Sequence, residues 1–96
     1  MNDTLALIVK FDVKNDQIAF VKSELMKILE PTRNEVGCML YELHQDLEHP
    51  NIFMFYEIWE TKDAWKAHDK KQHIIDFKKA IEDSVNDISF NKLKML

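Results

Sequence analysis

Apolar residues recur along this 96-residue chain with two different periods, and the change of period separates the expected elements. In three segments successive residues point to opposite faces, and either one face or both faces are apolar, as expected for strands that are at least half buried. These segments are Leu5–Val13, Cys38–Gln45 and Ile52–Trp59. A further alternation predicts a strand over Ile88–Met95.

Apolar residues at helical spacing fill the segments between these strands. A helix is expected from about Gln17, and Pro31 should kink or end it, because proline lacks an N–H and its ring clashes with the preceding turn. Thr61 is expected to cap a helix over Lys62–Lys70. Another helix is expected over His73–Val85. The core stripes of the first and last helices are Ile18, Val21, Leu25, Ile28, Leu29 and Ile74, Phe77, Ile81, Val85.

The order βαββαβ predicts an α+β, ferredoxin-like domain over residues 1–96, with a four-stranded antiparallel sheet and helices on one face. The other face of such a sheet normally carries polar residues. Here Leu5–Val9 and Ile52–Tyr56 are apolar on both faces. We therefore expect a homodimer formed through the open sheet face.

Charge and composition narrow the possible partners and the location. The formal charge of -4 provides no basic stripe, so nucleic acid is not an expected partner. No apolar run approaches the roughly 18–20 residues that span a bilayer, so we expect no membrane segment. The first residues lack the basic start of a secretory signal. The single cysteine suits a reducing cytoplasm, where we expect the protein to act.

Candidate chemistry is concentrated between Phe53 and His73. Glu57 shares a strand face with Trp59, and the following helix carries His68. Glu57 is either a pocket carboxylate that acts as a base or acceptor, or a structural carboxylate. Likewise, His68 is either a general acid or base or a satisfied structural histidine. Trp59 either stacks on an aromatic ligand or packs in the core.

The remaining polar candidates do not suggest a cofactor. His68 and His73 are five residues apart, which corresponds to roughly 140° around a helix, so no metal site is expected. His73 is interpreted as a cap or packing residue and Trp65 as packing. Arg33 and Glu35, where the first helical segment ends, either form an exposed ion pair or contact an anion or substrate. The chain has no glycine-rich loop to hold a nucleotide or flavin.

These residues also carry a family resemblance. Tyr56-Glu57-Ile58-Trp59, Ala64, His68 and His73, with upstream Arg33, Glu35, Gly37-Cys38 and Tyr41, resemble the antibiotic biosynthesis monooxygenase (ABM) superfamily. The resemblance is closest to small bacterial members that include quinol monooxygenases and an isomerase of a phosphorylated autoinducer. It implies a dimeric α/β barrel without a cofactor. Implied catalytic residues are Glu57 and His68, and implied substrate-binding residues are Trp59, Tyr41, Trp65, His73 and Arg33.

The chain departs from two branches of that superfamily. Phe55 and Trp65 stand where cofactor-free anthrone oxygenases carry asparagine and tyrosine. Leu5–Val9 lacks the asparagine of haem-degrading relatives. The leading hypothesis is a cofactor-independent quinol monooxygenase that uses O2. The alternatives are an isomerase of a small phosphorylated ketone and a non-catalytic dimeric binding or stress-response module.

Overall fold

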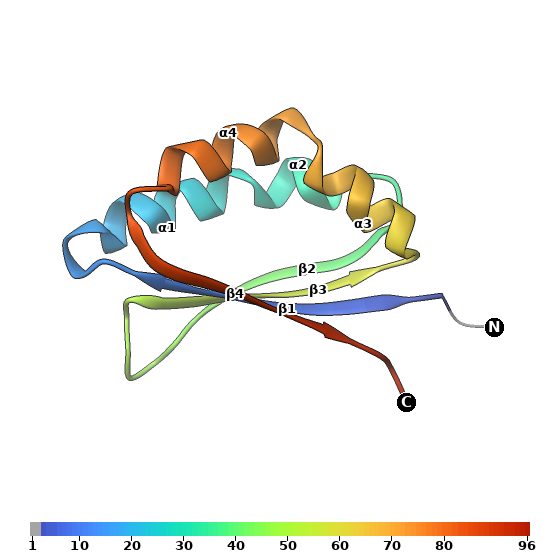
Figure 1. Ribbon diagram of the computed structural model, residues 1–96, viewed down its shortest axis with the longest axis horizontal. Coiled ribbons are helices and arrows are strands. Elements are labelled where there is room, and N and C mark those ends of the chain that lie inside the picture. Colours follow the sequence, from blue (N-terminus) through green and yellow to red (C-terminus); the bar gives the residue numbers. More distant parts are fainter. Residues whose placement is uncertain (1–2) are drawn as a thin grey trace.

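A computed structural model describes residues 3–96, which form a two-layer α+β domain. The strands are β1 (Leu5–Val13), β2 (Cys38–Gln45), β3 (Ile52–Trp59) and β4 (Val85–Leu93). The helices are α1 (Ile18–Lys27), α2 (Leu29–Arg33), α3 (Lys62–Asp69) and α4 (Gln72–Ile81), and a 3-10 turn at Asn15–Gln17 precedes α1. The antiparallel sheet has the order β2-β3-β1-β4, and the helices all lie on one of its faces (Figure 1). The ferredoxin-like prediction is confirmed.

The alternating residues of the strands divide into a covered face and an open face. On β1 and β3 the odd-numbered residues lie under the helices, and Leu7, Phe53, Phe55 and Trp59 are almost completely buried. Tyr41 of β2 lies on the same face, opposite Glu57. The largest core side chains therefore surround the one carboxylate on this face of β3.

Two local predictions about the helices are confirmed. The helical segment breaks at Ile28, where α1 has ended and α2 begins. The break lies just after Lys27, the residue whose carbonyl Pro31 cannot bond and against which its ring clashes. At the other helix pair, the hydroxyl of Thr61 accepts a 3.1 Å hydrogen bond from the backbone N–H of Ala64 and caps α3.

The boundary between α4 and β4 differs from the prediction. The helix ends at Ile81 instead of Val85, and the strand runs over Val85–Leu93 instead of Ile88–Met95. Val85 pairs with Val13 of β1 beside a β-bulge. Because Val85 follows Ile81 by four residues, it continues the helical stripe in the sequence although its backbone already belongs to the sheet.

Gly37 sets how closely the α2–β2 turn approaches α3. Its φ is +85°, a conformation that side-chain-bearing residues rarely adopt. A Cβ added there would lie 2.5 Å from the Cβ of Ala64. The carbonyl of Gly37 also accepts a 2.8 Å hydrogen bond from the backbone N–H of Glu60. This close approach brings Glu35 of the same turn against α3.

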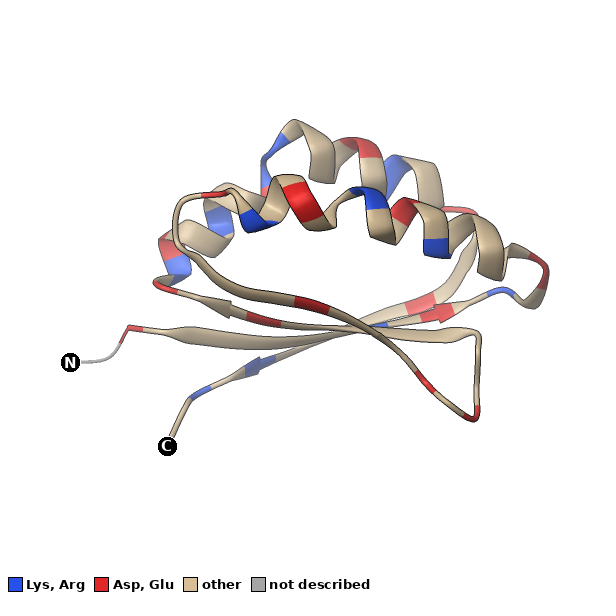
Figure 2. Ribbon diagram, turned by 180° about the vertical axis from the view of Figure 1, so that it is seen from behind, with Lys and Arg blue, Asp and Glu red and all other residues tan. Residues whose placement is uncertain are grey.

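Positively and negatively charged residues are interspersed along the helices (Figure 2). Between residues 3 and 96, no helix has the length and apolar character needed to cross a bilayer.

Candidate functional site

A cavity of about 60 Å³ lies between the covered face of the sheet and the helices α3 and α4. Its wall is mostly apolar, and its inner polar residues are Tyr41, Glu57 and His68. Asp69 and Lys78 are exposed and form an ion pair of 2.5 Å between the helices at the mouth. The lining residues are Val9, Phe11, Ile28, Tyr41, Phe55, Glu57, Trp65, His68, Asp69, Ile74, Phe77, Lys78, Ile88 and Phe90.

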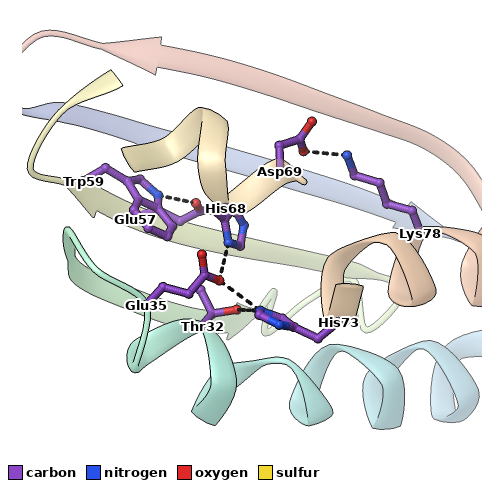
Figure 3. A network of polar contacts seen from close by, with 8 residues as sticks. All are labelled: Thr32, Glu35, Glu57, Trp59, His68, Asp69, His73 and Lys78. Carbon is purple, nitrogen blue, oxygen red and sulfur yellow. Dashed lines mark hydrogen bonds and ion pairs between the residues drawn. The ribbon is translucent and has the colours of Figure 1, made fainter. Parts of the chain in front are cut away.

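Glu57 is the most perturbed carboxyl group at this cavity. Its side chain is buried, and the indole Nε1 of Trp59 donates a 2.8 Å hydrogen bond to Oε1 (Figure 3). Burial raises the pKa of Glu57 to about 7, because the charged form loses its hydration, and the bond from Trp59 opposes that rise only in part. Glu57 can therefore gain or lose a proton near neutral pH.

His68 extends from α3 and lines the same cavity. Its Nδ1 lies 2.8 Å from Oε2 of Glu35, and its ring lies 4.7 Å from that of Trp59, measured between centroids. Burial lowers the pKa of His68, while the hydrogen bond and charge of Glu35 act in the opposite direction. The neutral imidazole is thus the favoured form at neutral pH.

Nε2, the second nitrogen of His68, has no hydrogen-bond partner among residues 3–96. Every fully buried side-chain nitrogen or oxygen of residues 3–96 has a hydrogen-bond partner. The hydrogen bond of His68 is made by Nδ1, so Nε2 must keep accessible surface, and the space that His68 lines is the cavity. By the same argument Oε2 of Glu57 is accessible there.

Glu35 connects His68 with His73, which extends from α4. Nε2 of His73 lies 2.9 Å from the same Oε2 of Glu35 and 3.3 Å from the hydroxyl of Thr32 (Figure 3). The side chains of Glu35 and His68 are 6% and 7% exposed, and that of His73 is 27% exposed. The cluster therefore runs from the cavity wall toward the surface.

The angular spacing around one helix does not describe how His68 and His73 lie, because each belongs to one of the two helices that the sequence predicted. His68 and His73 lie on different helices, and the turn between them allows both rings to reach Glu35. The possible ligand atoms of the three residues lie within 4.8 Å of one another, close enough to be drawn around one metal ion. Both nitrogens nevertheless already lie at hydrogen-bonding distance from a single carboxylate oxygen, so the group is satisfied as a polar cluster.

The other predicted site residues divide into two groups. Tyr41 and Trp65 line the cavity, and Trp59 supports it through Glu57. Tyr41 stacks on Phe55 at 4.5 Å between centroids, and burial raises the pKa of its hydroxyl far above its usual range.

His73 and Arg33 do not line this cavity. His73 bonds to Glu35, and Arg33 donates from Nε to the backbone carbonyl of Tyr41 at 3.0 Å, beside a separate surface hollow. The sequence interpretation paired Glu35 with Arg33, as an exposed ion pair or a substrate contact, and did not predict its contacts with the two histidines. Its signal was its place beside Arg33 in the family motif, since a turn residue has no periodic pattern.

The fold and the cavity define a small ferredoxin-like domain with buried ionisable groups beneath its helices. Residues 4–80 match the antibiotic biosynthesis monooxygenase family. The chain belongs to that family.

The individual relatives do not define a substrate. An uncharacterised protein of Synechocystis, sll1783, is 32% identical over 69 residues, covering 72% of this chain and 44% of the relative. YjcS of Bacillus subtilis, also uncharacterised, is 34% identical over 59 residues, covering 62% of this chain and 56% of the relative. The chain thus spans about half the length of these two proteins.

A solved structure extends the likeness over the whole fold. PA3566 of Pseudomonas aeruginosa superimposes with a TM-score of 0.95 at 27% identity, over 100% of this chain and 97% of that protein.

Proposed function

We propose that this protein is a cofactor-independent monooxygenase that acts on a small quinol with O2. The observation that carries the proposal is the pairing of Glu57 and His68 at one mostly apolar cavity, each with an accessible polar atom. Family membership supports the reaction class.

The two groups suit the first step of such an oxidation. His68, neutral because burial lowers its pKa, takes the proton of a substrate hydroxyl at Nε2. The resulting quinolate is electron-rich enough to give an electron to O2 without help from a cofactor. Glu57, with a pKa of about 7, can hydrogen-bond the second oxygen of the ring or return a proton to it. The apolar wall keeps water from the reactive intermediate.

The size of the cavity restricts the substrate. A cavity of 150 Å³ is known to admit a benzene ring, whereas this one is about 60 Å³. Entry of a ring therefore requires movement at the mouth, where Phe90 and Lys78 are both substantially exposed. We infer a substrate with a single aromatic ring, oriented by Glu57 and His68 on the inner wall, with Trp65 and Tyr41 against its faces or edges.

One observation favours a second candidate, the isomerisation of a small phosphorylated ketone. Among residues 3–96, Lys78 is the only lysine or arginine that lines the cavity, and it lies at the mouth, where a phosphate could remain in water. Glu57 and His68 would then move a proton between neighbouring carbons, a reaction that needs no O2.

Oxygen consumption separates the candidates. Purified protein is supplied with a panel of single-ring quinols in an oxygen-electrode cell, and the rate is compared with that of the same quinols without protein. Protein-dependent oxygen uptake supports the monooxygenase. Turnover of a phosphorylated ketose under nitrogen, without oxygen uptake on any quinol, supports the isomerase. Ligand binding without turnover of either class would favour the binding-module hypothesis.

A further inference from the structure

We infer that Glu35 is the positioning residue of this site, and that it holds the imidazole of His68 with Nδ1 turned away from the cavity and Nε2 turned into it. This inference rests on the proposed proton-transfer role of His68. Glu35 lies in the α2–β2 turn, outside the cavity, and has no contact with the space where substrate would bind.

The contact between His68 and Glu35 fixes the tautomer of the imidazole. A carboxylate oxygen accepts hydrogen bonds, so the 2.8 Å contact places a proton on Nδ1 of His68. A neutral imidazole carries only one N–H, and Nε2 is then an unprotonated base facing the cavity. Without Glu35, either nitrogen could carry the proton and the ring could rotate.

The negative charge of Glu35 also stabilises the protonated form of His68. If His68 accepts a substrate proton, an imidazolium forms in a buried site, which is costly unless an opposite charge lies close by. Glu35 provides this charge at hydrogen-bonding distance, so the pair becomes neutral overall when His68 is protonated. The other ionisable groups around His68 and its cavity are Asp69 on its own helix, Glu57 on β3, Tyr41 on β2, and His73 and Lys78 on α4.

His73 has a different task in this arrangement. It donates from Nε2 to the oxygen of Glu35 that also receives His68, and thereby orients the carboxylate. Because both rings bond to the same oxygen of Glu35, the hydrogen bond from His73 weakens the stabilisation that Glu35 gives to protonated His68. Removing Glu35 and removing His73 should therefore change the basicity of His68 in opposite directions.

The test uses long-range ¹H–¹⁵N spectra of the labelled protein across a pH series, which report the tautomer and titration midpoint of each histidine without any turnover. In the wild type we expect His68 protonated at Nδ1 when neutral. Glu35→Gln should populate the other tautomer and move the His68 midpoint to lower pH. His73→Gln should keep the tautomer and move the midpoint to higher pH. His49→Ala, in the exposed β2–β3 loop, is the matched control and should change neither.

Activity gives a second readout that a purely structural role would not produce. Glu35→Gln should lower kcat/KM by about tenfold or more, since it forfeits part of the contribution of a general base, and should shift the acidic limb of the pH–rate profile with the His68 midpoint. An unchanged tautomer and midpoint in Glu35→Gln would overturn the inference, as would one bound metal ion per chain held by this cluster. If Glu35→Gln does not fold, His73→Gln tests the inference instead. A His68 midpoint that moves to higher pH supports it, and a midpoint that stays or moves to lower pH overturns it. A wild type that shows the expected spectra but no turnover would refute the proposed function and leave the positioning by Glu35 established.

Discussion

The indole Nε1 of Trp59 donates a 2.8 Å hydrogen bond to Oε1 of Glu57, two residues earlier on β3. Residues two apart on a strand point to the same face, so this contact follows directly from the alternation. It fixes one oxygen of the carboxyl group and leaves the other accessible from the cavity. The bond favours the charged form of Glu57, while burial disfavours it more strongly.

Replacing Trp59 with phenylalanine should therefore raise the pKa of Glu57 further above about 7. It should also lower the free energy of unfolding by about 1–3 kcal/mol at neutral pH, because a buried acceptor loses its donor. Carboxyl ¹³C chemical shifts measured against pH report the first effect, and chemical denaturation reports the second. Trp65→Phe is the control, since Trp65 lines the same cavity but has no bond to Glu57. An unchanged Glu57 titration in Trp59→Phe would refute this account.

The raised pKa of Glu57 predicts a particular dependence of stability on pH. Between the ordinary value of 4.5 and about 7, the folded protein holds a proton that the unfolded chain has released, so this group's contribution to stability falls as pH rises. His68 has the opposite sign, because its lowered pKa makes the fold less stable as pH falls through 6.5. The effect of Glu57 on stability must therefore be measured as the difference between the wild type and a variant in which residue 57 does not titrate.

Glu57→Gln keeps the acceptor for Trp59 but cannot ionise. Relative to the wild type, this variant should gain in melting temperature as pH is raised from about 4.5 to about 7. Exposed Glu60→Gln provides the matched control and should follow the wild type. Parallel curves for wild type and Glu57→Gln would show that Glu57 does not keep its proton in the fold.

Catalytic roles for Glu57 and His68 predict a loss of turnover without a loss of structure. Glu57→Gln and His68→Gln should each reduce the rate of substrate-dependent oxygen uptake by about 10²–10⁴-fold, the usual contribution of a general acid or base. Circular dichroism should remain that of the wild type. Undiminished oxygen uptake in both folded variants would remove these residues from the mechanism.

The sheet and the apolar faces could be predicted from the sequence because alternation is a local property. The bounds of β1, β2 and β3 were predicted correctly for this reason. The α4–β4 boundary was missed because Val85 fits both periods, and only its pairing with Val13 decides between them.

The candidate site was predictable only in part. Glu57, Trp59 and His68 are close in the sequence, and a strand followed by a helix brings them together. Glu35 comes from a turn 33 residues before His68, and its contact depends on the close approach that Gly37 permits. Such a convergence has no local signature. The error over His73 had a similar origin, because angular spacing on a helix says nothing about residues on two helices.

The absence of a cofactor remains a prediction. We expect the purified protein to carry no flavin, haem or stoichiometric metal, because its chain has no glycine-rich phosphate loop or first-strand asparagine, and because Glu35 already satisfies both histidines. Elemental analysis and a visible spectrum after gel filtration check this expectation. A persistent absorption band or one metal ion per chain would contradict it.

The open face of the sheet leads to the last prediction, a homodimer formed through that face. The helices cover only the opposite side (Figure 1), yet the uncovered residues of β3 are Ile52, Met54, Tyr56 and Ile58. Ile8 of β1 pairs with Tyr56 on this face, and Ile8 and Met54 line a shallow hollow there. We propose that two such faces pack together, because an apolar sheet surface of this kind is unfavourable in water.

Sedimentation equilibrium at micromolar concentration should therefore give the mass of a dimer. Ile8→Glu or Met54→Lys should dissociate or unfold the protein, since a buried unpaired charge costs several kcal/mol. Met26→Lys, on the exposed side of α1, should leave the dimer and its stability intact, because Met26 is already 53% exposed. A monomeric wild type would refute the proposal. So would a dimer that tolerates both charges on the open face, because another surface would then have to form the contact.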